Sequence, residues 1–81
     1  MLVVEAYIFV NSDPGALRLI TEAIMAIEEV KMAHVVTGQF DVVAYAEFPN
    51  MDVLREIIDK VRSLKGIQRT QTAVGIPPRL E

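Results

Sequence analysis

The chain has 81 residues, of which 52% are hydrophobic and none is cysteine, and its formal net charge is −3. A chain of this length forms one domain that buries only about 60% of the surface exposed by its unfolded form, so its core is small. The lack of cysteine excludes disulfides and thiolate metal sites and fits a reducing compartment. The eight Lys and Arg residues are scattered and offer no phosphate-binding stripe, so we expect no direct nucleic acid partner. There is no apolar run of about 20 residues and no signal-peptide pattern, so we expect a cytoplasmic protein with no membrane partner.

The predicted elements begin with a strand and a helix. Residues 2–10 place apolar side chains on both faces of an extended chain, which predicts a first strand. Asp13 followed by proline is the pattern of a helix N-cap with proline at the first helical position. Apolar residues then recur at helical spacing, and Arg18 and Glu22 form an exposed i,i+4 pair, so we expect the helix to extend to about Glu28.

A hairpin, a second helix and a last strand follow. Residues 30–37 and 40–48 are β-branched and aromatic runs joined by a short turn, which predicts an antiparallel hairpin. Asn50 is suited to cap a helix that ends near Gly66, because glycine commonly terminates helices in the left-handed conformation. Residues 67–76 form the last predicted strand, and the two prolines after it are expected to end it.

The element order βαββαβ predicts an α+β fold of the ferredoxin-like type. Two βαβ halves with right-handed crossovers give a four-stranded antiparallel sheet with both helices on one face. No linker or low-complexity segment divides the sequence, so residues 1–81 are expected to form a single domain.

The other face of this sheet should be too apolar to face water. If the more apolar side of the first strand meets the helices, the open face receives Val3, Tyr7 and Phe9. The alternation of the third strand adds one of two sets of side chains, either Val43 and Tyr45 or Phe40, Val42 and Ala44. An apolar patch across several strands usually marks an interaction surface, and the mean hydropathy of +0.33 agrees with one. We therefore expect a homodimer with its sheets packed face to face, the association of dimeric α/β barrels.

Three motifs lie at the spacing found in one protein family. Residues 36–41 (VTGQFD), 64–67 (LKGI) and 69–72 (RTQT) resemble the C-terminal effector domain of the Lrp/AsnC family. These regulators are also called feast/famine regulatory proteins, and the domain is named for regulation of amino acid metabolism (RAM). The resemblance covers essentially the whole chain. Family members normally carry an N-terminal helix-turn-helix domain, whereas here Met1 leads directly into the first effector-domain strand, so the chain looks like a stand-alone sensor module.

The resemblance implies a regulatory ligand-binding domain with no catalytic activity and no cofactor. In the family, such domains dimerise and the dimers assemble into rings, commonly octamers. Small effectors, typically amino acids, bind between the dimers. A further partner that the resemblance suggests is a full-length Lrp/AsnC regulator, through which the chain would modulate transcription or amino acid metabolism.

The resemblance also points to particular residues. The family's effector-contacting turn is matched by Gly38, Gln39, Phe40 and Asp41. An amino acid is a zwitterion, so its site needs an anion or carbonyl groups for the ammonium, donors for the carboxylate, and room for the side chain. Gly38 would let backbone amides approach the ligand, Asp41 would pair with the ammonium, and Phe40 would line the pocket or a subunit contact. Thr70 and Thr72, which match the family's last-strand Thr-x-Thr, would donate hydroxyls to the carboxylate.

The same residues also have purely structural interpretations. Gly38 would satisfy a positive φ in the turn, and Asp41 would accept hydrogen bonds from turn amides. Thr70 and Thr72 are good strand residues in any setting. His34 is the only histidine and has no cysteine or paired acid at ligand spacing, so we assign it no metal and no other role.

Three other functions stay open at this point. The loop at residues 13–15 (DPG) resembles that of ACT domains, another βαββαβ module that binds amino acids near this loop and the following helix. A small dimeric α/β-barrel enzyme would need an acid–base group in its cleft, for which His34 and Asp41 are the candidates. A purely structural module would join full-length regulators without a ligand of its own.

Overall fold

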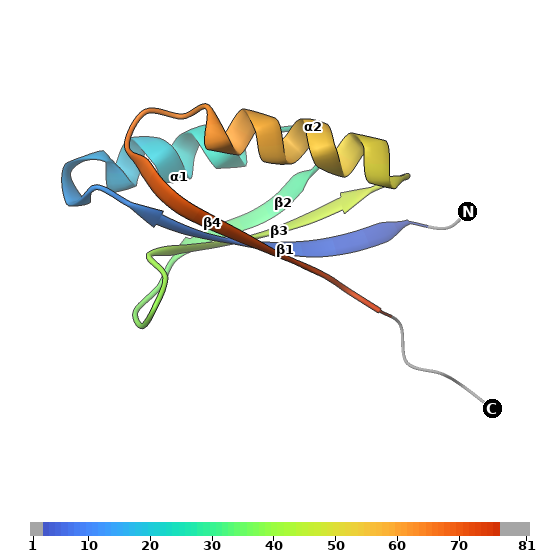
Figure 1. Ribbon diagram of the computed structural model, residues 1–81, viewed down its shortest axis with the longest axis horizontal. Coiled ribbons are helices and arrows are strands. Elements are labelled where there is room, and N and C mark those ends of the chain that lie inside the picture. Colours follow the sequence, from blue (N-terminus) through green and yellow to red (C-terminus); the bar gives the residue numbers. More distant parts are fainter. Residues whose placement is uncertain (1–2, 77–81) are drawn as a thin grey trace.

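A computed structural model describes residues 3–76, which form a four-stranded antiparallel sheet with two α-helices on one face (Figure 1). The elements in chain order are β1 (Val4–Ser12), the 3₁₀ turn η1 (Pro14–Ala16), α1 (Leu17–Met25), β2 (Val30–Val35), β3 (Val42–Phe48), α2 (Met51–Arg62) and β4 (Ile67–Val74). The strands lie in the order β2-β3-β1-β4, which confirms the ferredoxin-like βαββαβ fold. Pro77 and Pro78, predicted to end the last strand, lie outside the described residues.

The start of the first helix differs from the prediction. Asp13 has the extended backbone of an N-cap, but its side chain makes no cap hydrogen bond. Its Oδ1 instead accepts a 2.6 Å hydrogen bond from Nε2 of Gln68 at the start of β4. Residues 14–16 form a 3₁₀ turn, and α1 begins only at Leu17. Asp13 and Pro14 thus occupy the predicted N-cap and first positions, but of the 3₁₀ turn, and the Asp13 carboxylate binds Gln68 and supplies no cap bond.

The first helix and three of the strands are also shorter than predicted, whereas β1, predicted over residues 2–10, continues to Ser12. α1 ends at Met25 instead of about Glu28, and the next residues turn the chain back so that Val30 enters β2 with its side chain buried. β2 stops at Val35 and β3 starts at Val42, so the turn between them is wider than the sequence suggested.

The second helix agrees with the prediction at its start but not at its end. Asn50 has an extended backbone, and its Oδ1 accepts a 3.1 Å hydrogen bond from the Val53 N–H, which satisfies one of the free donors at the helix start. The helix ends at Arg62, and its C-cap Ser63 is right-handed, so Gly66 does not end the helix. Gly66 does have the expected positive φ, +97°, but in the turn just before β4. A side chain there would also be crowded, because a Cβ on Gly66 would lie 2.6 Å from the Cβ of Ala16.

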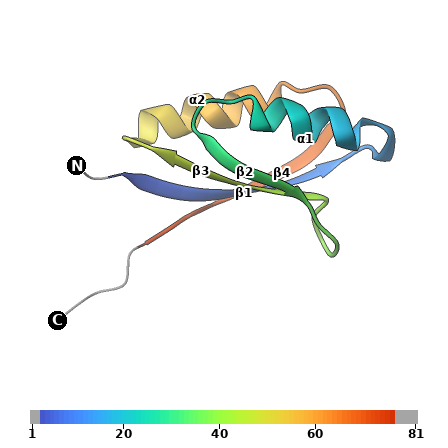
Figure 2. The same cartoon turned by 180° about the vertical axis from the view of Figure 1, so that it is seen from behind.

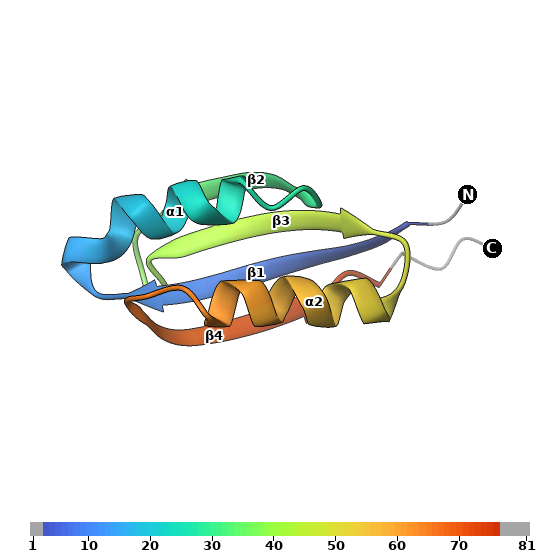
Figure 3. The same ribbon diagram turned by 90° about the horizontal axis from the view of Figure 1, so that it is seen from above.

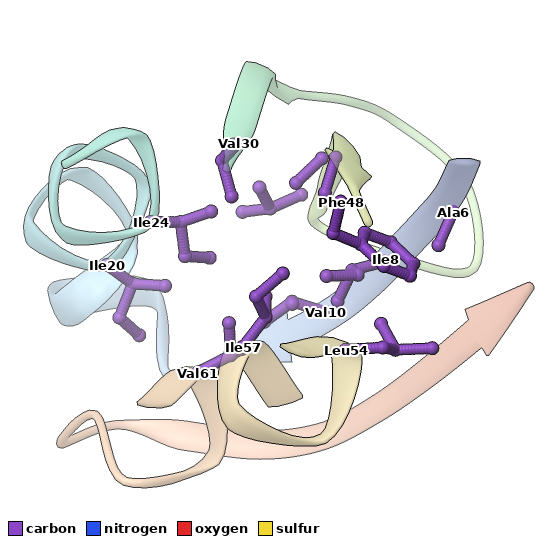
Figure 4. Close-up of a cluster of buried hydrophobic side chains, with 13 residues drawn as sticks. Ala6, Ile8, Val10, Ile20, Ile24, Val30, Phe48, Leu54, Ile57 and Val61 are labelled. Carbon is purple, nitrogen blue, oxygen red and sulfur yellow. The ribbon is translucent and has the colours of Figure 1, made fainter. Parts of the chain in front are cut away.

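The core lies between the sheet and the helices (Figure 4). Alternate residues of β1 and β3 point toward the helix layer and are fully buried, which is the period-two pattern of a half-buried sheet. α1 covers the β2 side of the sheet and α2 covers the β4 side (Figure 3). The largest fully buried side chains are Phe48, Ile8, Ile20, Ile24, Ile57, Val10, Val42 and Val61. No helix within residues 3–76 is long and apolar enough to cross a membrane.

The opposite face of the sheet, here called the open face, carries aromatic side chains. Tyr7 lies opposite Tyr45 across β1 and β3, with ring centroids 5.2 Å apart. Of the two sets offered by the sequence for β3, the one with Tyr45 lies on this face, because Val42 and Ala44 are buried under the helices. Within residues 3–76 no helix or strand covers the open face (Figure 2), and the side chain of Tyr7 is 44% exposed.

Candidate functional site

The turn between β2 and β3 projects from one end of the sheet on the side away from the helices (Figures 1 and 2). The Val36 N–H donates to the Asp41 carbonyl at 2.9 Å and closes the turn, and the Asp41 N–H donates to the Val10 carbonyl of β1 at 2.9 Å. Gly38 has φ +111°, and a Cβ at this position would have no atom within 4 Å. Glycine is therefore favoured here by the backbone conformation alone, and the backbone at the tip is open to a ligand or a partner.

Asp41 has protein partners of its own. Its Oδ2 accepts a 3.0 Å hydrogen bond from the Ser12 N–H and a longer one, 3.4 Å, from Nδ2 of Asn11. The same Asn11 amide donates to the Gln39 carbonyl at 2.9 Å. These contacts fasten the turn to the end of β1, so Asp41 has a structural role, but its donors lie on β1 and not in the turn, where the sequence placed them. Both hydrogen bonds to the Asp41 carboxylate use Oδ2, and the second oxygen of this half-buried carboxylate accepts no hydrogen bond from the described residues.

Phe40 lies on the open face at the base of the turn, although the sequence grouped it with Val42 and Ala44, which are buried under the helices. Phe40 precedes the start of β3, so the alternation of that strand does not extend to it. The Phe40 ring packs against Phe9 with centroids 5.3 Å apart, and the guanidinium of Arg69 lies 5.4 Å from its centroid, which is within cation–π range. Arg69 is paired with Asn11 in the β1–β4 register. Sequence reasoning missed both Arg69 and Asn11, although each directly contacts a predicted turn residue. Strand alternation puts Arg69 on the opposite face from Thr70, but the polar sequence of β4 does not indicate which of these faces carries the turn.

Thr70 and Thr72 lie away from the turn. In the β1–β4 register they pair with Val10 and Ile8, whose side chains are buried under the helices. Paired residues of antiparallel strands point to the same face, so both threonines face the helix layer and are half-buried there. Within one chain the structure does not bring them together with the turn. A site that used both the turn and the two threonines would need the turn of one subunit and β4 of another.

A second cluster of polar side chains lies at the end of the open face that is farthest from the turn. The Tyr45 hydroxyl donates a 2.9 Å hydrogen bond to Oε2 of Glu47, and Glu47 lies directly opposite Glu5 across the two central strands. Partial burial of the phenol, followed by the nearby carboxylates of Glu5 and Glu47, raises the pKa of Tyr45 well above its usual value. The phenol therefore stays protonated at neutral pH and acts as a donor, while the two carboxylates stand side by side.

An open depression lies in the helix layer of the molecule, beside α1. It has a volume of about 560 Å³ and is bounded by η1, α1 and the loop before β4. Its walls are mainly apolar and include Leu19, Ala23 and Leu64, with Lys65 and Asp13 at its rim. This is the region indicated by the resemblance to ACT domains, and none of the turn residues reaches it.

The chain matches the family model of the Lrp/AsnC ligand binding domain over residues 5–76. It belongs to this family. The family is a regulatory one, defined by ligand binding and not by catalysis. A search of curated protein sequences gave no significant match.

Solved structures show the same fold. TTHA0845 from Thermus thermophilus superposes with a TM-score of 0.89 at 23% identity, covering 96% of this chain and 99% of that one. Hypothetical protein PHS023 from Pyrococcus horikoshii gives a TM-score of 0.83 at 33% identity, covering 93% and 92%. The transcriptional regulator NMB0573 from Neisseria meningitidis, solved as a complex with L-Met, gives 0.83 at 21% identity and covers 96% of this chain but 53% of its own. The fold of this chain is thus found both in proteins of similar length and as half of a longer regulator.

Proposed function

We propose that this chain is an amino acid-sensing domain of the Lrp/AsnC type. The family match supports ligand binding, and the L-Met complex of a regulator with the same fold supports an amino acid as the ligand. The observation that carries the proposal is the projecting β2–β3 turn, which combines an open left-handed glycine with a carboxylate that has one oxygen to spare. The chain would act in the cytoplasm, where free amino acids report on metabolism.

In this proposal the turn binds the amino acid through complementary charges. The free oxygen of Asp41 pairs with the ligand ammonium, and the exposed backbone at Gly38 and Gln39 approaches the ligand closely. Phe40, held between Phe9 and Arg69, forms an apolar wall. Because Thr70 lies on the other face of the sheet, it joins the site, together with Thr72, only from a neighbouring subunit.

Assembly is the second part of the proposal. The open face, with Tyr7 and Tyr45 at its centre, is covered by a second copy of the chain, and the dimers associate further into a ring, with an octamer as the expected size. Ligand bound between dimers then changes the stability of the ring. Full-length regulators of the same family are the proposed partners through which this change reaches transcription.

A thermal-shift screen of the twenty amino acids, with light scattering on the same samples, tests the proposal. A ligand bound only by the native state stabilises it by about 2.7 kcal/mol at a hundred times its Kd. For a domain of this size that is a rise of roughly 10–20 °C in Tm. One amino acid or a chemically related group should raise the Tm and shift the assembly mass. If no amino acid at millimolar concentration moves either quantity, the sensor proposal is wrong.

An ACT-like site is the second candidate, and the depression beside α1 favours it. Its volume of about 560 Å³ falls in the range of small-molecule pockets, and its apolar walls suit an aliphatic side chain. Leu19 lies on its wall and is 70% exposed, so Leu19→Glu should leave the fold intact while placing a carboxylate where a ligand would lie. If Leu19→Glu abolishes the thermal shift and Asp41→Asn preserves it, the ligand binds at the depression and not at the turn.

A further inference from the structure

An open groove with polar walls lies where the end of α2 meets the start of β4. These two segments lie side by side at one end of the molecule (Figures 1 and 3). The groove has a volume of about 450 Å³, and its lining residues are Arg62, Ile67, Gln68, Arg69 and Thr70. None of these side chains is acidic. The basic residues are scattered in the sequence, but the fold brings two arginines to one groove.

The groove runs along a free edge of the sheet. β4 is an edge strand, and β1 is its neighbour. On β1 the Val10 carbonyl bonds toward β3 and the Glu5 carbonyl bonds toward β4, so the odd-numbered residues of β1 bond to β4. Phe9 is therefore hydrogen-bonded to its partner Gln71. The N–H and carbonyl of Thr70, the residue before Gln71, point outward at the free edge.

A β-bulge shapes the start of β4. The β1–β4 register shifts between Asn11 and Ser12, so that Gln68 is an extra residue without a partner on β1. Its Nε2 donates the 2.6 Å hydrogen bond to Oδ1 of Asp13. Bulges commonly re-aim the side chains around them. Here the bulge brings an amide side chain to the Asp13 carboxylate, while Arg69 follows on the open face.

The two arginines come from different layers of the molecule. The guanidinium of Arg69 lies on the open face, 5.4 Å from the centroid of the Phe40 ring. Arg62 belongs to the last turn of α2, in the helix layer. A guanidinium offers several N–H donors in a planar fork that suits phosphate. Together with the outward N–H of Thr70, donors face the groove from three directions.

Neither arginine has a carboxylate partner within the described part of the chain. The ion pair found among residues 3–76 joins Arg18 and Glu22 of α1. The acidic residues beside the groove in the chain or in the strand register do not line it, and they are Asp13, Asp41 and Asp59. The first two already accept hydrogen bonds from other side chains or from the backbone. The two positive charges at the groove repel each other, and a bound anion would offset this repulsion.

We propose that this groove binds a phosphate group, either as the free ion or on a small metabolite. Donors that come from three directions suit a tetrahedral anion, whose oxygens accept on several sides, better than a planar carboxylate. The inference goes beyond the proposed function, because the groove uses Arg62 and Arg69 and does not use Asp41. A phosphate-bearing metabolite would thus be recognised separately from an amino acid at the turn.

Calorimetric titration with inorganic phosphate and pyrophosphate tests the inference, with sodium chloride added to keep the ionic strength constant. The wild type should bind both ions saturably at millimolar concentration. Arg62→Gln and Arg69→Gln should each weaken binding by about 10-fold or more, because each removes charge-assisted hydrogen bonds. Lys31→Gln, an equal loss of charge on the opposite edge strand, is the matched control and should bind normally. Circular dichroism confirms that each variant is folded.

Two further probes define the chemistry of the ligand. Binding of glycerol phosphate indicates a phosphate ester, binding of inorganic phosphate alone indicates the free ion, and either result supports the inference. Equally tight binding of succinate overturns the assignment to phosphate. The groove is also excluded if the wild type binds no phosphate, if either arginine variant binds normally, or if Lys31→Gln weakens binding equally. Asp41→Asn should bind phosphate normally, so failure of the amino acid site and failure of the phosphate site are separate results.

Discussion

Two glycines with similar backbone conformations should respond very differently to alanine. Gly66 and Gly38 have φ values of +97° and +111°, so an added Cβ costs about 1–2 kcal/mol at either position. At Gly66 the new Cβ would also lie 2.6 Å from the Cβ of Ala16, and overpacking of this kind costs about 1–3 kcal/mol. At Gly38 a new Cβ would have no atom within 4 Å beyond the two adjacent residues. We therefore expect Gly66→Ala to lower the free energy of unfolding by about 2–5 kcal/mol and Gly38→Ala by about 1–2 kcal/mol.

Urea unfolding followed by circular dichroism measures this difference. The two variants and the wild type are compared at one protein concentration, because oligomerisation makes the apparent stability depend on it. The reduction of unfolded-chain entropy by alanine is common to both variants, so the gap of about 1–3 kcal/mol between them reports the contact with Ala16. Equal losses at Gly66 and Gly38 would refute the close packing of η1 against the loop before β4.

Three further variants test the open face, the second helix and the core. Tyr45→Phe should reduce the loss of stability at alkaline pH. Folding raises the pKa of Tyr45, so the phenol's contribution to stability is complete below about pH 10. This contribution is lost at higher pH, because the phenol loses its proton in the unfolded chain before it does so in the folded one. Unfolding curves at pH 8 and pH 11 check this, and an unchanged pH dependence in the variant would contradict it. Asn50→Ala should cost about 1 kcal/mol in urea unfolding through loss of the 3.1 Å cap bond to the Val53 N–H, and no change would mean that the cap is dispensable. Ile57→Ala, at a fully buried site on α2, should cost about 2–5 kcal/mol by the same measurement, whereas a loss below 1 kcal/mol would show that the helix is loosely packed.

The architecture could be predicted because its signals are local. The alternation in β1 and the cap at Asn50 each act within a few residues, and each was found where the sequence placed it. The start of α1 could not be predicted in the same way. There the Asp13 carboxylate binds Gln68, a residue 55 positions further along the chain, and not a backbone amide of the helix start. Long-range competition of this kind leaves no mark in the local pattern.

The candidate site could be located from the sequence but not completed. The motif of residues 36–41 indicated the turn, and the structure places that turn at a projecting, accessible position. Which strand residues lie beside it depends on register. Arg69 and Thr70 are adjacent in the chain, yet only Arg69 lies on the same face as Phe40. The polar sequence of β4 has no apolar alternation from which its faces could be assigned.

The most direct test of amino acid binding at the turn is calorimetric titration of Asp41→Asn. Asparagine keeps an oxygen to accept the 3.0 Å hydrogen bond from the Ser12 N–H, so the turn should hold while the negative charge is lost. Asp59→Asn, on the exposed side of α2, makes the same change of net charge and serves as the control. With the amino acid that stabilises the wild type, Asp41→Asn should bind more weakly by about 1.5–3 kcal/mol, or roughly 10- to 150-fold, and Asp59→Asn should bind normally. If a folded Asp41→Asn protein binds as tightly as the control, Asp41 is only a turn residue and the ligand does not bind at the β2–β3 turn through this carboxylate.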